Sequence, residues 1–241
     1  MPRSAVQPFR TVKKQKKKQS KRGRPSLARA ASIDNHVLDT VWTLFVESGF
    51  GSVTIDAIAA RGNLSKRTIY SRFESKEELF CASAERQISA WQAQLTEPVP
   101  EADFVCWASV FAERLLSLMI TPECRALTEF TDGEGRRIPR IRALHKRARA
   151  DGITMISSVL RGEIVRGHVG LSDEDFAARC WLDILVAQAR DFEELASVPA
   201  TENLIRERAR AVTDIFLRVV GYRRHLGMTI PRVRKYGIQR S

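Results

Sequence analysis

Residues 53–80 read VTIDAIAARGNLSKRTIYSRFESKEELF and hold the clearest structural signals in the chain. Thr54 and Ser65 are good N-cap residues, and each precedes a short segment whose apolar side chains recur at helical spacing. Gly62 lies between the two segments, where we expect a helix to end on a residue in the left-handed conformation. The stretch therefore predicts a short helix, a tight turn and a second short helix, which is the helix-turn-helix layout.

The second short helix is expected to have one apolar and one polar face. Ile69 and Phe73 are four residues apart, so they lie on the same side of a helix. The other side carries hydroxyl groups, cations and a phenol, which are the groups that bind phosphates and base edges in the major groove. We interpret this helix as a DNA-reading element. A purely structural α-hairpin has the same spacing, so the spacing alone does not decide between the two readings. The flanking segments favour DNA binding.

The flanking sequence predicts an all-α protein with one large or two small domains. Apolar residues recur at helical spacing through most of the 241 residues, and strand-like alternation is scarce. Pro98 and Pro100 interrupt the pattern, and residues 132–135 (Asp-Gly-Glu-Gly) predict a loop. Outside the helix-turn-helix, helices are expected from Ser32 to Gly49, Ser75 to about Leu95, about Phe104 to Met119, Pro122 onward, Ile138 to about Arg166, Ser172 to about Leu195 and Thr201 to Val220.

The net charge of +12 is concentrated at the N-terminus. Residues 1–31 contain eleven Lys and Arg and no acid, whereas the remaining chain holds 29 basic and 28 acidic residues. A basic arm on a nearly neutral body indicates a polyanionic partner. Arg22 and Arg24 flank Gly23, and such an extended segment fits a narrow minor groove. We expect a disordered basic arm (1–28), a helix-turn-helix domain (29–80), a helical ligand-binding and dimerisation domain (81–225) and a basic tail (226–241).

The sequence offers no sign of a cofactor, a metal site or a catalytic residue. Its four Cys show no CxxC pair, its four His are isolated, and no Gly-rich phosphate loop or Ser/His/Asp set is present. No apolar run of about twenty residues predicts a membrane span. Two other classes stay open beside a regulator: an architectural DNA-coating protein that binds through its arm, and an enzyme with an attached DNA-binding head.

Residues 32–80 resemble the DNA-binding head of TetR-family transcriptional regulators. The matching positions are Phe45, Gly49, Phe50, Val53, Thr54, Ile55, Ile58, Ala59, Gly62, Ser65, Thr68, Ile69, Tyr70, Phe73 and Ser75 to Leu79. The resemblance implies a nine-helix, cytoplasmic bacterial protein that binds a palindromic double-stranded operator as a homodimer. It also implies release by an effector, here a small apolar or aromatic molecule, and repression as the default mode.

The resemblance also implies roles for individual residues. In the DNA-binding head, Ser65 opens the recognition helix, Lys66, Arg67 and Arg72 lie near base edges, and Thr54, Thr68, Tyr70 and Lys76 hold phosphates. The expected effector pocket lies among the fourth to seventh helices, with Trp91, Phe104, Trp107, Phe111, Met119, Phe130, His145 and Met155 as its lining. Each of these eight is also an ordinary core residue by pattern. The expected dimer interface, on the last two helices, contains Phe176, Trp181, Ile184, Leu185, Val212, Ile215, Phe216 and Val219.

Overall fold

The computed structural model describes residues 27–99, 103–194 and 200–223, and the regular structure in them is entirely helical. This confirms the predicted all-α class. The described residues form nine α-helices and a short 3-10 helix: α1 (Leu27–Ser52), α2 (Ile55–Arg61), α3 (Lys66–Tyr70), α4 (Lys76–Leu95), α5 (Phe104–Met119), α6 (Pro122–Asp132), η1 (Glu134–Arg137), α7 (Pro139–Val165), α8 (Glu174–Glu194) and α9 (Glu202–Val219). The predicted basic arm and C-terminal basic tail lie outside the described residues.

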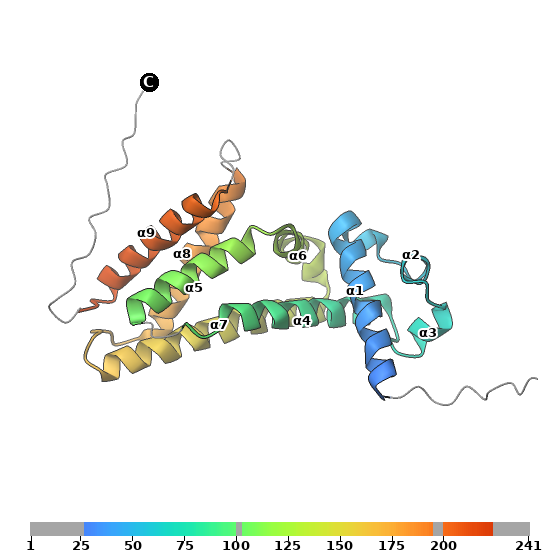
Figure 1. Ribbon diagram of the computed structural model, residues 1–241, viewed down its shortest axis with the longest axis horizontal. Coiled ribbons are helices and arrows are strands. Elements are labelled where there is room, and N and C mark those ends of the chain that lie inside the picture. Colours follow the sequence, from blue (N-terminus) through green and yellow to red (C-terminus); the bar gives the residue numbers. More distant parts are fainter. Residues whose placement is uncertain (1–26, 100–102, 195–199, 224–241) are drawn as a thin grey trace, which may run out of the picture.

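The helices are arranged as a small head and a longer body (Figure 1). Helices α1 to α3 form the head at one end. Helix α4 leaves the head and contacts α7, while α6 packs against α1 beside the head. In the body, α5 packs on α9 and α8, and α7 packs on α8. The boundary expected after Phe80 falls inside α4, so a single helix belongs to both parts.

Two clusters of buried apolar side chains hold the fold together. The body cluster joins α5, α7, α8 and α9 around Trp181, which is fully buried. The head cluster contains residues of α1 to α4 and also Leu127 and Phe130 of α6 and Ile141 of α7. The core of the head is therefore completed by helices of the body, and burial of this apolar surface fixes the head against α6 and α7.

Four phenylalanines form the centre of the head cluster. Phe80 lies with its ring centroid 4.8 Å from Phe45, 4.9 Å from Phe50 and 5.1 Å from Phe130. Most of these pairs are edge-to-face, the geometry that aromatic quadrupoles favour. We call Phe45, Phe50, Phe80 and Phe130 the aromatic quartet. It joins α1, α4 and α6 at the junction of head and body.

Four of the predicted helix starts are confirmed by N-cap hydrogen bonds. The side chains of Thr54, Ser65, Ser75 and Thr201 each accept a hydrogen bond from the backbone N–H three residues later, at the starts of α2, α3, α4 and α9. Each cap satisfies a helix N–H that has no partner inside its helix. The Glu78 carboxylate accepts from the backbone N–H of Glu74, one residue before the position of the usual capping box.

Gly62 differs from the expected left-handed cap. Its φ is −83°, whereas the following Asn63 has φ 49° and takes the left-handed conformation. Asn tolerates that conformation better than most residues. Gly62 is required for a different reason, because a methyl group there would lie 3.0 Å from the carbonyl oxygen of Ile58 and 3.3 Å from Oγ1 of Thr40. A side chain here would therefore require the end of α2 or Thr40 of α1 to shift by a few tenths of an ångström.

Two predicted boundaries were wrong. Helix α1 begins at Leu27 and not at Ser32, because the alanines before Ser32 are strong helix formers that continue the helix. The predicted loop at residues 132–135 is instead the end of α6 followed by η1. This turn is tight, since a methyl group on Gly135 would lie 2.8 Å from the carbonyl oxygen of Phe130. Within α1, Gly49 has φ 76° and marks the predicted end of the regular helix.

Among the described residues, no single helix has the length and apolar character needed to cross a membrane. Only α5 and α6 taken together meet those criteria, and they are bent by 73°. The same part of the chain contains no group of three or more His, Cys, Asp or Glu side chains placed to hold a metal ion.

Candidate DNA-binding head and ligand pocket

Helix α3 is held at its start and on its inner face. The Ser65 Oγ accepts a hydrogen bond from the Thr68 backbone N–H at 3.0 Å and lies 2.8 Å from the Thr68 hydroxyl. Ile69 is fully buried in the head cluster, whereas Tyr70 is 58% exposed. The helix is therefore fixed to the head by its cap and one buried side chain, and it presents its hydroxyl groups and a phenol to solvent.

The three predicted base-edge cations have different environments. Lys66 forms an ion pair with Asp56 of α2, and the hydrogen bond to that carboxylate raises the pKa of Lys66. Arg67 is exposed and forms no ion pair with any of the described residues. Arg72 forms an ion pair with Asp34 of α1, and only 18% of its side chain is exposed. Arg72 therefore joins α3 to α1 inside the head, which corrects its expected place on the exposed face.

Two of the predicted phosphate-binding residues lie at helix N-termini. Thr54 caps α2 by accepting from the Ala57 N–H at 3.1 Å. Lys76 is the first residue of α4, and its Nζ lies 4.0 Å from the centroid of the Phe50 ring. Both positions place a polar group where the helix dipole favours an anion. Arg22 and Arg24 lie outside the described residues.

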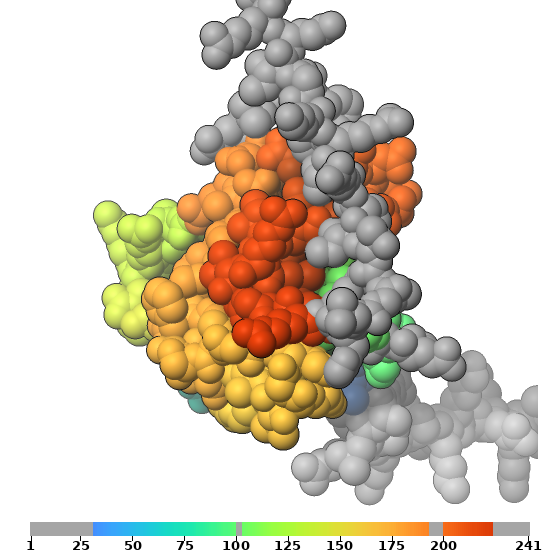
Figure 2. Space-filling model, turned by 90° about the vertical axis from the view of Figure 1, so that its left-hand side faces the viewer, coloured from blue at the N-terminus to red at the C-terminus, as the bar shows by residue number. Residues whose placement is uncertain are grey.

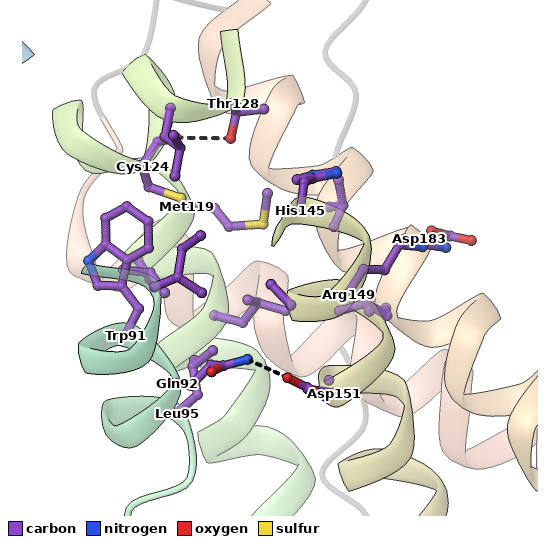
Figure 3. A pocket seen from close by; sticks show the side chains of 18 of the residues that line it. Trp91, Gln92, Leu95, Met119, Cys124, Thr128, His145, Arg149, Asp151 and Asp183 are labelled. Atoms are coloured by element: carbon purple, nitrogen blue, oxygen red, sulfur yellow. Dashed lines mark hydrogen bonds and ion pairs between the residues drawn. The ribbon is translucent and has the colours of Figure 1, made fainter. Parts of the chain in front are cut away.

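The body contains a cavity of about 720 Å³ bounded by α4, α5, α6, α7 and α8 (Figure 3). Its wall is mainly apolar. Five of the eight predicted lining residues contribute to it: Trp91, Phe111, Met119, His145 and Met155. Cavities of this size and character bind small molecules in many proteins.

Phe104, Trp107 and Phe130 do not line the cavity, contrary to prediction. The Phe104 ring lies 6.1 Å from that of Trp107 and 5.3 Å from that of Tyr222, in the body core away from the cavity. Phe130 belongs to the aromatic quartet. The helical period places these residues on buried faces, but α5 and α6 each have more than one buried face.

Sequence reasoning missed the polar part of the cavity wall. Arg149 forms an ion pair with Asp183 at 2.6 Å, and the Gln92 side-chain amide lies 3.4 Å from a carboxylate oxygen of Asp151 (Figure 3). A second ion pair, Arg190 with Asp132 at 2.9 Å, lies at the α6 end. The two residues of each pair come from different helices and lie at least 34 positions apart in the sequence (183 − 149 = 34 for the nearest pair). No local spacing in the sequence marks such pairs.

The predicted dimer residues divide into two sets. Trp181, Leu185, Val212 and Phe216 are no more than 5% exposed and pack inside the protomer, where the Trp181 and Phe216 rings stack at 4.5 Å. Their expected place on the dimer surface is therefore corrected. Phe176, Ile184, Ile215 and Val219 are 40% to 74% exposed. Figure 2 shows α9 at the surface, at the end of the body far from the head.

Both parts of the molecule match known families. The family described as "Bacterial regulatory proteins, tetR family" matches residues 37–82, and "AefR-like transcriptional repressor, C-terminal domain" matches residues 109–222. The chain belongs to the TetR family. It is a DNA-binding transcriptional regulator with a helix-turn-helix head. The matched family, and the relative and structural neighbours described below, are all regulators of transcription.

Individual relatives agree with this family. The uncharacterized HTH-type transcriptional regulator YdeS of Bacillus subtilis (strain 168) is 43% identical over 58 residues, which are 24% of this chain and 28% of YdeS. The structure of the flavonoid-responsive regulator FrrA matches with a TM-score of 0.66 and 25% identity, over 78% of this chain and 97% of FrrA. A transcriptional regulator from Rhodococcus sp. Rha1 shares the fold, with a TM-score of 0.64 and 16% identity over 79% of this chain and 99% of its own.

Proposed function

We propose that this TetR-family regulator is a repressor that binds a palindromic operator as a homodimer and is released by a small, largely apolar molecule. The observation that carries this proposal is that the cavity and the head core share residues. Trp91 of α4 and Leu127 of α6 line the cavity and also belong to the head cluster. A ligand that changes the packing of either residue therefore acts directly on the core of the DNA-binding head.

The contacts of these helices give the coupling a physical route. The Trp91 ring lies 5.8 Å from that of Trp42 in α1, in an edge-to-face arrangement. On α6, Thr128 and Thr131 line the cavity, whereas Phe130 packs against the other three rings of the aromatic quartet. A ligand that binds better to one arrangement of α4 and α6 shifts the population towards it, and the operator affinity changes by that differential binding energy.

The cavity wall favours an uncharged or weakly polar effector. Its two arginines, Arg149 and Arg190, are both paired with carboxylates, so neither offers an unpaired charge to an anionic ligand. The aromatic and aliphatic wall supports an aromatic or aliphatic ring system, and the name of FrrA records a response to flavonoids in a relative of this fold. His145 is available as a polar contact for a hydroxyl or carbonyl group, and Thr128, whose hydroxyl donates to the Cys124 carbonyl oxygen, can accept a hydrogen bond from a hydroxyl.

In this proposal α3 enters the major groove. Lys66, Arg67 and Tyr70 project from its exposed face, with Ser65 and Thr68 at its start. Thr54 and Lys76 bind phosphates on either side through the starts of α2 and α4. Arg72 supports the head from inside and does not contact bases.

The exposed apolar residues of α8 and α9 support the homodimer. Phe176 and Ile184 lie on α8, and Ile215 and Val219 lie on α9. A pair of helices packed on its own copy forms a self-complementary interface with twofold symmetry. Ile215→Glu combined with Val219→Glu places two charges there and should convert the dimer to a monomer in sedimentation. Thr154→Glu, on an exposed turn of α7, is the control that should stay dimeric.

The central experiment selects bound sequences from a random duplex pool, with the full chain and with a truncation lacking residues 1–28. A palindromic consensus shared by both proteins is the expected result. Absence of a consensus, or binding that disappears with the arm, would replace this proposal by a DNA-coating protein. The selected duplex then reports on effectors, and a flavone is the first compound to test. Met155→Trp narrows the cavity and should weaken the response to the flavone without weakening operator binding.

A further inference from the structure

The start of α7 and the preceding η1 carry an unusual concentration of positive charge. Between Glu134 and Asp151 the sequence contains seven Lys or Arg and no acid, although the chain after residue 31 is almost neutral. Six of the seven side chains are exposed. We call these six residues the basic surface: Arg136, Arg137, Arg140, Arg142, Lys146 and Arg147.

The basic surface is not neutralised within the protomer. The seventh cation, Arg149, pairs with Asp183, whereas none of the other six forms an ion pair with any of the described residues. This distinguishes them from most other arginines of the body, such as Arg161 with Glu174 or Arg190 with Asp132. Six neighbouring cations repel one another, and this repulsion destabilises the isolated chain.

The position of these cations increases that cost. Arg140 and Arg142 lie in the first turn of α7, where the helix dipole disfavours positive charge. The first turn contains no acidic residue, and Ile138 at the N-cap makes no side-chain cap hydrogen bond. Several unpaired cations therefore lie near the positive end of the α7 dipole, where each of them is unfavourable. An anion bound at this surface would offset both the repulsion and the interaction with the dipole.

The start of the basic surface is fixed against the core of the head. Ile141 is buried in the head cluster, and Ile138 packs against it. A methyl group on Gly135 would lie 3.0 Å from the Phe130 ring, so Gly135 lies beside that ring. The Phe130 ring lies 5.0 Å from Phe50, and the Lys76 Nζ lies 4.0 Å from the centroid of the Phe50 ring. Three successive contacts thus lead from η1 to a lysine at the start of α4. In Figure 1, α6 and the turn after it lie beside α1, at the head end of the body.

We propose that the basic surface is a second DNA-binding site, which binds phosphates of the duplex that flanks the half-site contacted by α3. The partner is the sugar–phosphate backbone, since arginines without fixed partners bind phosphates without regard to sequence. This inference rests on binding of DNA by the head, and it adds affinity and salt dependence but no base specificity. In the proposed dimer the surface is present twice, so the flanking contacts are doubled.

The test compares two fourfold variants of the full chain. In the first, Arg136, Arg137, Arg140 and Arg142 are replaced by Gln; in the second, the same four residues are replaced by Lys. Fluorescence anisotropy measures the affinity of each protein for a labelled random-sequence duplex, over salt concentrations from about 50 to 200 mM. Each lost phosphate contact should reduce the slope of log affinity against log salt by about 0.9.

The Gln variant should bind the duplex about tenfold or more weakly at the low-salt end, with a slope reduced by about 1 to 4, whereas the Lys variant should match the original protein. Equal affinities and slopes in the two variants would overturn the proposal and leave the surface to an acidic protein partner. A lower affinity with an unchanged slope would also overturn it. Arg67→Gln in the head, measured on the selected operator, tests the head separately, so failure of one site is distinguishable from failure of the other.

Discussion

The head and the body of this regulator solve opposite packing problems. The head is built from the long helix α1 and the short helices α2 and α3 around the aromatic quartet, and its core residues, such as Phe80, are almost fully buried. The body is built from α4 to α9, and α4 to α8 enclose a cavity of about 720 Å³. DNA recognition needs a fixed geometry, which dense packing provides. A response to a ligand needs space for the ligand and helices that can move at a small cost in free energy. A cavity provides the space, and the helices around it have fewer packing contacts to lose. The two requirements meet at α4 and α6.

The largest effect is expected from Phe130→Ala, with Phe104→Ala as its matched control. Both side chains are buried to the same degree, Phe130 in the aromatic quartet and Phe104 in the body core. Each substitution should lower the free energy of unfolding by about 3 to 5 kcal/mol, because a cavity is left behind. Only Phe130→Ala should also weaken operator binding by the protein that remains folded. Chemical denaturation and anisotropy measure the two effects.

An equal loss of operator affinity in the two variants would contradict the comparison, because it would mean that the whole body supports the head. Phe130→Leu provides a milder version if the alanine variant does not fold. It keeps most of the apolar volume, so it should retain stability while still loosening the edge-to-face contacts to Phe45 and Phe80.

The next effect concerns the turn between α2 and α3. Gly62→Ala should lower the free energy of unfolding by about 1 to 3 kcal/mol, because the new methyl group would crowd the Ile58 carbonyl oxygen and the Thr40 hydroxyl. Gly51→Ala is the control, since a methyl group there meets no atom within 4 Å and its φ is not left-handed. If thermal melting shows the two variants to be equally stable, the close approach of α2 to α1 is not a constraint on the fold.

The N-cap hydrogen bonds explain why the sequence predicts the helices of the head well. Its helices start at Thr54, Ser65 and Ser75, whose side chains cap the next turn, and such signals extend over only three residues. A local pattern is then sufficient to place each element. Even here the left-handed residue is Asn63 and not the predicted Gly62, and the close contact of Gly62 with Thr40 of α1 has no local signal in the sequence.

Caps offer a smaller and more selective test. Ser65→Ala and Thr201→Ala each remove one N-cap hydrogen bond, at α3 and α9 respectively. Each should lower the free energy of unfolding by about 1 kcal/mol. Ser65→Ala should also weaken operator binding, because the start of α3 would fray, whereas Thr201→Ala should leave DNA binding unchanged. A loss of operator affinity in the Thr201 variant would mean that the last helix affects the head through the dimer.

In the body, the sequence predicted where the helices lie but not which face of each helix points inwards. Trp181 and Phe216 have the same apolar character as Ile184 and Ile215, yet the first two are buried in the protomer and the last two are exposed. Helices α8 and α9 have apolar residues on more than one side, so the helical period cannot separate core from interface. The paired charges of the cavity, such as Arg149 with Asp183, join separate helices and have no local signal.

The smallest effect is a stabilisation within α7. Gly152 lies in the helix, and a methyl group there would meet only Leu182, at an ordinary distance of 3.8 Å. Gly152→Ala should therefore raise the free energy of unfolding by about 0.5 to 1 kcal/mol, because glycine is a poor helix former. Thermal melting should show a rise of about 2 to 4 °C per kcal/mol for a chain of this size.

Gly162→Ala, near the C-terminal end of the same helix, controls for the general effect of alanine, since its nearest neighbour is the flexible Arg166 side chain at 3.5 Å. Both variants should be more stable, but only Gly152 lines the cavity, so only Gly152→Ala should change the affinity for the effector. A destabilised Gly152→Ala protein beside a stabilised Gly162→Ala protein would show that α7 must bend at the cavity. In that case α7 would adopt two conformations beside the cavity, and Gly152 would allow the response to the ligand at the expense of stability.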